Sequence, residues 1–464
     1  MRATSGTAMS LLVALASAGA SAGAAPPAAA AIGAGAPAPA QAAGGEGAAR
    51  PEGERAAGTG AQAARRAPER VTFAEAVRRA RVQAVTSVLS AEEVRRAQAL
   101  LGQARSASLP LLTAQTSYTR LDSDRVANGV VLADRDQLAA AGVAQLPLVA
   151  PSRWVSWSHA SEQVGVSRAS DLDVQRTAAI TAARAYLAIL AQRRLVDVSR
   201  SARTIAQARY DFAHARRVGG IGNAVDELRA EQQLATGEAQ LESAGVGLLT
   251  AQESLGVVTA SSGPLDAAEE PRFDPRPAAD AAAAAEAVRP DVRAARARVD
   301  LAARVARDSW TDWLPTLLAT GQVFYQAPPT TLAPRTGWQI QFVLSLPIFE
   351  GGLRAAQREE RGALTREARA ALDGVTRQAR SEVRLGLEQV ARLEAALAQA
   401  RRAAERAATV LKLTIESYRA GNTTDLDVST AQQQSRDADT AAVVAEDAVR
   451  QSRLDLLSAL GQFP

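Results

Sequence analysis

Residues 314–352 read LPTLLATGQVFYQAPPTTLAPRTGWQIQFVLSLPIFEGG. Leu-Pro occurs at 314–315 and again at 346–347, and apolar and polar residues alternate between the two. Proline has no N–H for a ladder or a helix, and it disfavours helix in the residue before it, so each Leu-Pro marks a boundary. The segment is therefore predicted to be a strand hairpin. One face of its second strand, at 337–349, is apolar and carries Trp338, Ile340, Phe342, Leu344 and Leu346.

The same arrangement occurs about 200 residues earlier in the chain, which is typical of a duplicated supersecondary unit. Leu-Pro stands at 109–110 and at 146–147, and the segments between these pairs again alternate, as in Leu112, Ala114, Thr116 and Tyr118. A long run without proline follows each hairpin, at 152–263 and 348–463. The repeated unit is predicted to be helix, strand hairpin, long helix, turn and helix.

Both proline-free runs predict very long helices, at 153–219 and 353–420, each roughly 100 Å long at 1.5 Å per residue. Their apolar residues step by three and four, which favours coiled-coil packing. In the second run these residues are Leu397, Ala400, Ala404, Ala407, Leu411, Ile415 and Tyr418. Shorter helices are predicted at 71–107, 223–258, 286–312 and 422–461. Two short helices placed end to end would lie along each long one.

The remaining segments set the domain organisation. Residues 1–24 have the basic start, apolar core and small-residue site of a secretory signal peptide, and the Ala/Gly/Pro-rich residues 25–67 are expected to be a disordered tail. The first structural repeat is placed at 68–256, with its hairpin at 110–147, and the second at 286–464, with its hairpin at 315–347. Residues 257–285, which contain four prolines, are expected to link the repeats.

Composition excludes several function classes. The net charge of the 464 residues is only +4, and acidic residues alternate with basic ones, so a nucleic-acid partner is not expected. The two histidines, His159 and His214, have no cysteine partners because the chain has no cysteine. No metal site, cofactor motif or nucleophile motif is recognisable. The chain is therefore expected to be no enzyme and to hold no cofactor.

The strand count bears on the assembly. Apart from the expected signal peptide, no stretch reaches the 18 apolar residues of a membrane helix. Two hairpins supply four strands, and open sheet edges cannot stand in hydrocarbon. Three copies would supply twelve strands, enough for a closed channel. In that case the lipid-facing residues are Trp338, Ile340, Phe342 and Leu344. The alternative is a soluble amphipathic hairpin packed on helices.

A glycine lies near the middle of each proline-free run and is followed six residues later by aspartate. The pairs are Gly220 with Asp226 and Gly421 with Asp427. Glycine adopts the left-handed turn that ends a helix, and aspartate is favoured at the start of the next one. These residues are therefore predicted to form the turns between the long helices and their return helices.

In its motifs and their order, the chain resembles the TolC-type outer-membrane factor family, also called outer membrane efflux proteins. The resemblance covers 71–461. It rests on Val71-Thr72-Phe73-xx-Ala76, Ala104-Arg105-xxx-Leu109-Pro110, Arg289-Pro290-Asp291-Val292-xx-Ala295, Leu346-Pro347-Ile348-Phe349-Glu350-Gly351-Gly352 and Tyr418-xx-Gly421-xxxxx-Asp427-Val428-xx-Ala431-Gln432. The implied fold is mainly α with membrane β: a homotrimeric twelve-stranded β-barrel in the outer membrane on a twelve-helix α-barrel tunnel in the periplasm.

The resemblance also implies a function. Such a chain is the outer-membrane exit duct of a tripartite efflux pump or of a type I secretion system, working with a periplasmic adaptor protein and an inner-membrane transporter. Asp427 matches a gate-lining aspartate of the family, with Asp226 and Asp425 as further gate candidates. Gly220 and Gly421 are candidates for the tips that contact the adaptor. The competing interpretation is a periplasmic coiled-coil adaptor or a structural envelope protein.

Overall fold

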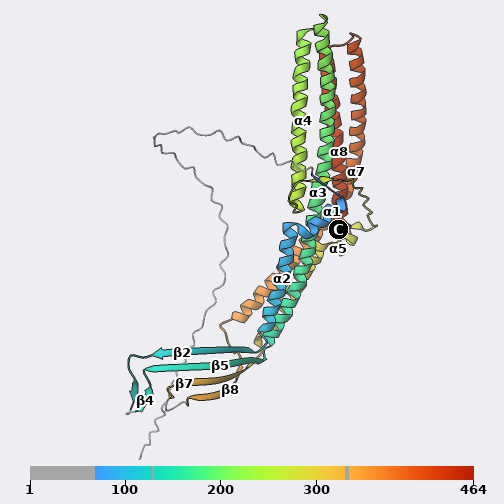
Figure 1. The fold of residues 1–464 in the computed structure, drawn as a ribbon. Coiled ribbons are helices and arrows are strands. Elements are labelled where there is room, and N and C mark those ends of the chain that lie inside the picture. Colours follow the sequence, from blue (N-terminus) through green and yellow to red (C-terminus); the bar gives the residue numbers. More distant parts are fainter. Residues whose placement is uncertain (1–67, 128–129, 330–333, 464) are drawn as a thin grey trace, which may run out of the picture. The chain divides into compact units, whose positions relative to one another are not determined.

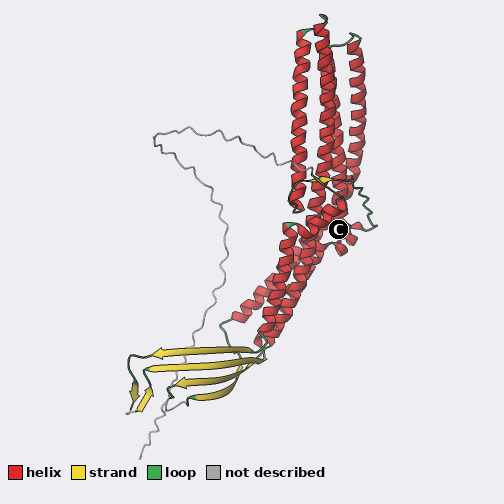
Figure 2. Cartoon of the chain, in the orientation of Figure 1, coloured by secondary structure: helices red, strands yellow, loops and turns green. Residues whose placement is uncertain are grey.

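The computed structural model describes residues 68–127, 130–329 and 334–463. The expected signal peptide and tail, 1–24 and 25–67, lie outside the described residues. Helices make up most of the described chain, and the longer strands gather at one end of the helices (Figures 1 and 2). None of the described helices has both the length and the apolarity needed to cross a membrane.

The two long helices form as predicted. Helix α3 spans Pro151–Val218 and α7 spans Leu353–Arg419. Helix α3 packs against α2 (Val85–Ser106) and α4 (Ala224–Val258), whereas α7 packs against α6 (Pro290–Arg307) and α8 (Asp425–Ala459) (Figure 1). The expectation that two shorter helices accompany each long one is thus confirmed. The predicted apolar stripe of α7 is also its least exposed face, with Ala404 and Leu411 buried.

Two of the predicted short helices are interrupted. The helix expected at 71–107 consists of α1 (Phe73–Gln83) and α2, because Ala84 leaves the helical region with φ −56° and ψ 140°. Ser87 donates a hydrogen bond to the carbonyl of Ala80 across this break, at 3.1 Å. The helix expected at 286–312 consists of α5 (Ala281–Val288), α6 and the 3-10 helix η1 (Asp308–Trp313). Pro290 begins α6, where its missing N–H costs nothing.

The segment 257–285 is more structured than a linker. It contains β6 (Leu265–Ala267), which pairs in parallel with β1 (Glu69–Val71), and α5 already begins at Ala281. Tyr186 of α3 is fully buried beneath this small sheet. Its hydroxyl donates to the carbonyl of Glu269 at 2.9 Å and accepts from the Glu269 N–H at 3.1 Å. The main apolar core therefore lies where β1, β6, α1, α3, α4 and the end of α8 meet.

Both predicted hairpins are present and join in one antiparallel sheet. Its strands are β2 (Leu111–Arg120), β5 (Asp136–Val149), β7 (Thr316–Ala327) and β8 (Thr336–Ser345), in the order β2-β5-β7-β8. The central pairing of β5 with β7 joins the two halves of the chain. Strands β2 and β8 are the edges of this four-stranded sheet, which is not a closed barrel within one chain.

Two details of the hairpins differ from expectation. The first hairpin does not end at Pro147, because β5 continues to Val149. Pro147 lies beyond the last residue paired with β2 and at a register shift against β7, a place where a strand tolerates proline. The connection at 122–136 also contains two short paired strands, β3 (Arg125–Ala127) and β4 (Val130–Ala133).

Candidate functional site

The turns that join α3 to α4 and α7 to α8 carry the predicted tip glycines. Gly220 and Gly421 both adopt left-handed backbone conformations, with φ of +76° and +80°. Beyond each glycine, the next N–H donates back into the long helix. Ile221 donates to the carbonyl of Arg216 at 3.0 Å, and Asn422 donates to that of Ser417 at 2.9 Å. Because only glycine reaches this conformation without steric cost, the prediction that these residues end the helices is confirmed.

Asp427 forms a capping box with Thr424 at the start of α8. The Asp427 carboxylate accepts from the backbone N–H of Thr424 at 2.9 Å and from its hydroxyl at 2.7 Å. The Asp427 N–H donates to the same hydroxyl oxygen at 3.3 Å. Donation from the side chain and backbone of Thr424 lowers the pKa of Asp427 below its ordinary value of 3.8. Asp427 is therefore an exposed, ionised residue with a defined structural role.

Asp425 differs from Asp427 because it is buried and ion-paired. Arg209 of α3 donates from Nε to Asp425 Oδ1 at 3.1 Å and from Nη2 to the Asp425 carbonyl at 3.1 Å. The two side chains are only 6% and 4% exposed. Asp425 Oδ2 is buried and has no hydrogen-bond partner among the described residues. The pair joins α3 to the first turn of α8, and no pattern in the sequence predicts that these positions, 216 residues apart, meet.

Asp226 lies half-buried in the first turn of α4, but Asn223 caps that helix by accepting from the N–H of Val225 at 3.1 Å. The neighbouring Glu227 is buried and was missed by the sequence interpretation. Its carboxylate is bound by Arg217 and, at 2.7 Å, by Nδ1 of His214, both near the end of α3. The hydrogen bond from Arg217 lowers the pKa of Glu227 most, and the contact with His214 lowers it further. The sequence contains one sign of this cluster: His214 and Arg217 are three residues apart near the end of one predicted helix, and Glu227 lies at the acidic start of the next.

A polar groove runs between the return helices α4 and α8. Residues of α3, α4 and α8 line it, including Asp425, and Gln233 of α4 donates to the hydroxyl of Ser429 of α8 across it. Farther along, Arg436 of α8 donates to the Gln240 side chain of α4 at 2.6 Å. The groove lining is rich in amide and hydroxyl groups, which bind peptide or water rather than apolar surfaces.

The second candidate site is the apolar face of the sheet. Residues directly opposite each other in an antiparallel pair lie on the same face. Trp338 pairs with Val323, Val323 with Gly142, and Gly142 with Ala114. The register therefore brings the apolar positions of both hairpins onto one face, as their parity predicted. Trp338, Ile340, Phe342 and Leu344 are all exposed there, because none of the described helices covers this side of β8.

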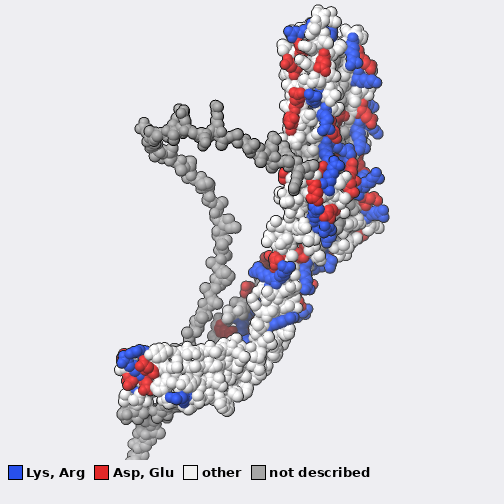
Figure 3. Space-filling view, in the orientation of Figure 1, with Lys and Arg blue, Asp and Glu red and all other residues white. Residues whose placement is uncertain are grey.

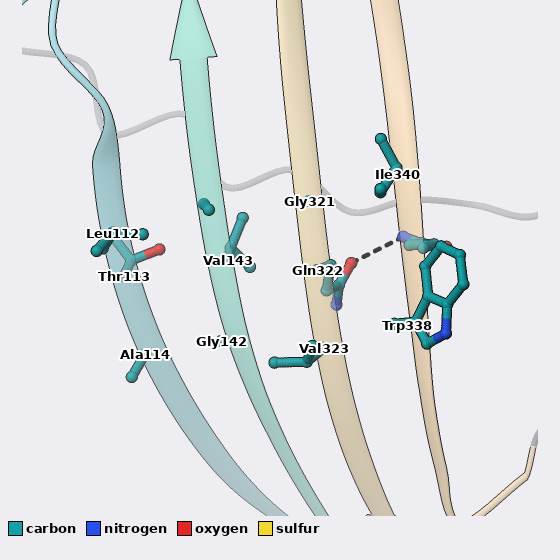
Figure 4. A pocket seen from close by; sticks show the side chains of 12 residues that line it. Leu112, Thr113, Ala114, Gly142, Val143, Gly321, Gln322, Val323, Trp338 and Ile340 are labelled. Atoms are coloured by element: carbon teal, nitrogen blue, oxygen red, sulfur yellow. Dashed lines mark hydrogen bonds between the residues drawn. The ribbon is translucent and has the colours of Figure 1, made fainter.

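The opposite face of the sheet is largely polar. Gln339 donates to the Gln322 side chain at 2.8 Å across the β7–β8 pair (Figure 4). The hollow in Figure 4 belongs instead to the apolar face; all four strands line it, and Gly142 and Gly321 contribute no side chain there. Between its two ends the sheet has no charged residue, and the space-filling view shows charges gathered at the end around β3 and β4 (Figure 3).

Nothing in the described part of the chain has the geometry of a metal site, since no group of three potential ligands occurs there. The two histidines are instead bound to single carboxylates. His159 Nε2 lies 2.9 Å from Asp308 Oδ2, and His214 binds Glu227 as described above.

Comparisons with known proteins agree with this architecture. Residues 282–462 match the model of the outer membrane efflux protein family. The chain is 31% identical over 285 residues to the fusaric acid resistance protein FusA of Burkholderia cepacia. This match covers 57% of the chain and 53% of the relative, so the chain spans about half the length of that curated protein.

Solved structures match nearly the whole described chain. The CmeC outer membrane channel of Campylobacter jejuni aligns with a TM-score of 0.72 and 15% identity, covering 84% of this chain and 85% of that one. The MtrE outer membrane channel of Neisseria gonorrhoeae, in its open state, aligns with a TM-score of 0.71 and 19% identity, covering 84% and 88%. At these identities the likeness concerns the fold.

Both of these solved structures are outer membrane channels, and the matched family is that of the outer membrane efflux proteins. Residues 282–462 thus match the outer membrane efflux protein family, and the described chain as a whole has the fold of the outer membrane channels with which it aligns.

Proposed function

We propose that three copies of this chain form a passive export duct across the outer membrane and periplasm. The observation that carries the proposal is the four-stranded sheet, which has one apolar face and two edge strands, β2 and β8. Edge strands expose unpaired backbone groups, which hydrocarbon does not tolerate. Pairing β2 of one copy with β8 of the next removes every edge, and three copies give a closed twelve-stranded barrel that encloses a channel.

The assembly is tested by the mass of the protein in detergent and by outer-membrane fractionation. The expected species is a trimer in the outer-membrane fraction, with migration on unheated gels that changes on boiling. A monodisperse monomer with full β-sheet signal contradicts the proposal. A soluble periplasmic pool supports the alternative of an envelope coiled-coil protein.

The turns at the far end of the helices are proposed to contain the gate. Asp427 is exposed and ionised, and Asp226 is half-buried. Each chain contributes these two aspartates, so three copies would place six carboxylates around one constriction of the channel. A ring of carboxylates attracts cations. The third candidate, Asp425, is bound by Arg209, and we assign it to that ion pair rather than to the ring.

The gate is tested by conductance in planar bilayers. Asp427→Asn is the informative variant, because the amide oxygen of asparagine can still accept from the N–H of Thr424 but the side chain has no charge. It is expected to lower cation selectivity and to weaken block by multivalent cations, with the trimer yield unchanged. Asp427→Ala removes the capping contacts as well and serves as the comparison. Unchanged selectivity in Asp427→Asn, Asp226→Asn and the double variant would leave only the capping role.

We further infer that the tips at Gly220 and Gly421 bind a periplasmic adaptor, which couples the duct to an inner-membrane transporter. One support is the groove between α4 and α8, which lies beside these tips and is lined by amide and hydroxyl groups. The other is the set of exposed apolar residues near it, Val218, Ile221 and Leu426. Photo-crosslinking from position 221 in whole cells is expected to capture an adaptor of the same operon. Position 385, in the middle of α7, is the control. Equal yields of the crosslinked adaptor from positions 221 and 385 would contradict a contact at the tips.

A further inference from the structure

A hollow with a volume of about 550 Å³ lies beside the main apolar core, and we call it the α1 hollow. Four segments that are far apart in the sequence line it: helix α1, Gln175 of α3, residues 271–273 and residues 457–463. Pockets that bind small molecules have volumes of about 300–1,000 Å³. The membrane sheet and the turns at Gly220 and Gly421 belong to other parts of the chain, so neither of their proposed roles explains this hollow.

One wall of the α1 hollow is a cluster of phenylalanine rings that the fold holds in place. The ring centre of Phe73 lies 5.5 Å from that of Phe273 and 6.3 Å from that of Phe463, and both pairs meet edge to face. The side chain of Gln462 accepts from the backbone N–H of Arg276 at 3.3 Å and donates to its carbonyl at 2.8 Å. These contacts fix the end of the chain against the segment before α5, so a ligand would meet walls that are already formed.

The charged side chains of the α1 hollow are all cationic. Arg78, Arg81 and Arg272 line it, and no aspartate or glutamate is among the described residues that do so. Arg78 donates to Glu75 at 2.8 Å, whereas the side chains of Arg81 and Arg272 form no ion pair or hydrogen bond with a described residue. A guanidinium group is a planar fork of donors that matches the geometry of a carboxylate. The hollow therefore combines aromatic walls with two cations that have no counter-charge in the described chain.

We propose that the α1 hollow binds a small aromatic carboxylic acid in its anionic form. The aromatic ring of the ligand would pack against the phenylalanine rings, which favour edge-to-face contacts with another ring. The carboxylate would accept from Arg81 and Arg272. The ligand would also cover Val82, an apolar lining residue that is 64% exposed. This inference goes beyond the export role and does not depend on it, because it concerns neither the sheet nor the turns.

The test is isothermal titration calorimetry of the purified full-length protein in lipid nanodiscs, with empty nanodiscs as the baseline. The probe is 2-naphthoate, and its uncharged analogue 2-naphthamide is the control ligand. We expect saturable binding of 2-naphthoate that is about tenfold tighter than that of the amide and that weakens as salt is added, since the contact is ionic.

Two results of this titration would overturn the proposal. Equal affinity for 2-naphthoate and 2-naphthamide would show that the arginines do not select an anion. Absence of binding of 2-naphthoate would show that the hollow is not an open site, as is expected if a segment of a second copy of the chain covers it.

Substitutions identify the site. Arg81→Gln and Arg272→Gln are each expected to weaken binding of 2-naphthoate about fivefold and to leave binding of 2-naphthamide unchanged, because an ionic contact near the surface contributes up to about this factor. The matched control is Arg276→Gln, since Arg276 is exposed in the same segment but does not line the hollow. Equal losses in Arg272→Gln and Arg276→Gln would indicate a general attraction to positive charge and would overturn the proposal.

A second pair of variants tests the apolar wall without touching the arginines. Val82→Glu places a carboxylate beside the expected carboxylate of the ligand and should abolish binding of 2-naphthoate, whereas Val82→Gln has nearly the same size without the charge and should retain most of it. Position 82 is exposed, so neither variant should disturb the fold, and unchanged far-UV circular dichroism checks this. Equal binding by the two variants would contradict a site for an anion at this position.

Discussion

Asp425→Ala is predicted to weaken the attachment of α8 to α3 more than any other single substitution at the helix turns. The reason is that the substitution leaves the guanidinium of Arg209 buried without its counter-charge, since both side chains are less than one tenth exposed. Removing one partner of a buried ion pair costs about 3–5 kcal/mol, whereas replacing both by apolar residues is often neutral.

The structure favours the lower end of that range. Only Oδ1 of the Asp425 carboxylate is bound by Arg209, and Oδ2 is buried without a hydrogen bond among the described residues, so the native pair already contains an uncompensated atom. We therefore expect a loss of about 3 kcal/mol, which corresponds to about a hundredfold faster unfolding if the pair is broken in the transition state.

The assay is the rate of unfolding of the purified protein in guanidinium chloride, followed by far-UV circular dichroism. Arg209→Met is the matched control because it removes the other partner, and the double variant Arg209→Met with Asp425→Leu completes the cycle. Each single variant is expected to unfold faster than the double variant. Rate effects that simply add in the double variant would show that the two residues are not energetically coupled, and the reasoning would be wrong.

Three further predictions concern the sheet, the cap and the core. Phe342→Arg should cost about 2–4 kcal/mol at the membrane midplane and reduce the trimer in outer-membrane fractions, whereas Gln341→Arg should not; equal losses would mean that the lipid face is wrongly assigned. Because the pKa of Asp427 is lowered, its stabilisation is present above pH 3.8 and is lost as the pH falls through the lower folded-state pKa. Asp427→Asn should therefore unfold with a weaker acid dependence there, and an identical pH profile would contradict this. Tyr186→Phe keeps the ring but removes the hydroxyl that binds the backbone of the 257–285 segment, so unfolding should become easier by about 1–3 kcal/mol; an unchanged midpoint in denaturant would show that the hydroxyl contributes nothing.

Apolar periodicity and the positions of proline and glycine predicted the two long helices and the two hairpins, but not the break at Ala84 or the pairing of β1 with β6. Proline-free runs with three- and four-residue apolar steps determined α3 and α7 almost to the residue, since helix length depends on local backbone chemistry. Gly220 and Gly421 ended these helices as predicted, because a left-handed turn is a local requirement that glycine meets. The strict alternation in the hairpins likewise determined which side chains share a face.

Only the tertiary structure decided which distant segments meet. The pairing of β5 with β7, the contact of Arg209 with Asp425 and the burial of Glu227 between His214 and Arg217 depend on how separate helices and strands dock. Periodicity reports which face of an element is apolar and carries no information about its partner. The same limit explains why Asp425, Asp226 and Asp427 read alike in the sequence: one is buried in an ion pair, one is half-buried and one is an exposed cap, because burial is a property of the packed helices and not of the residue.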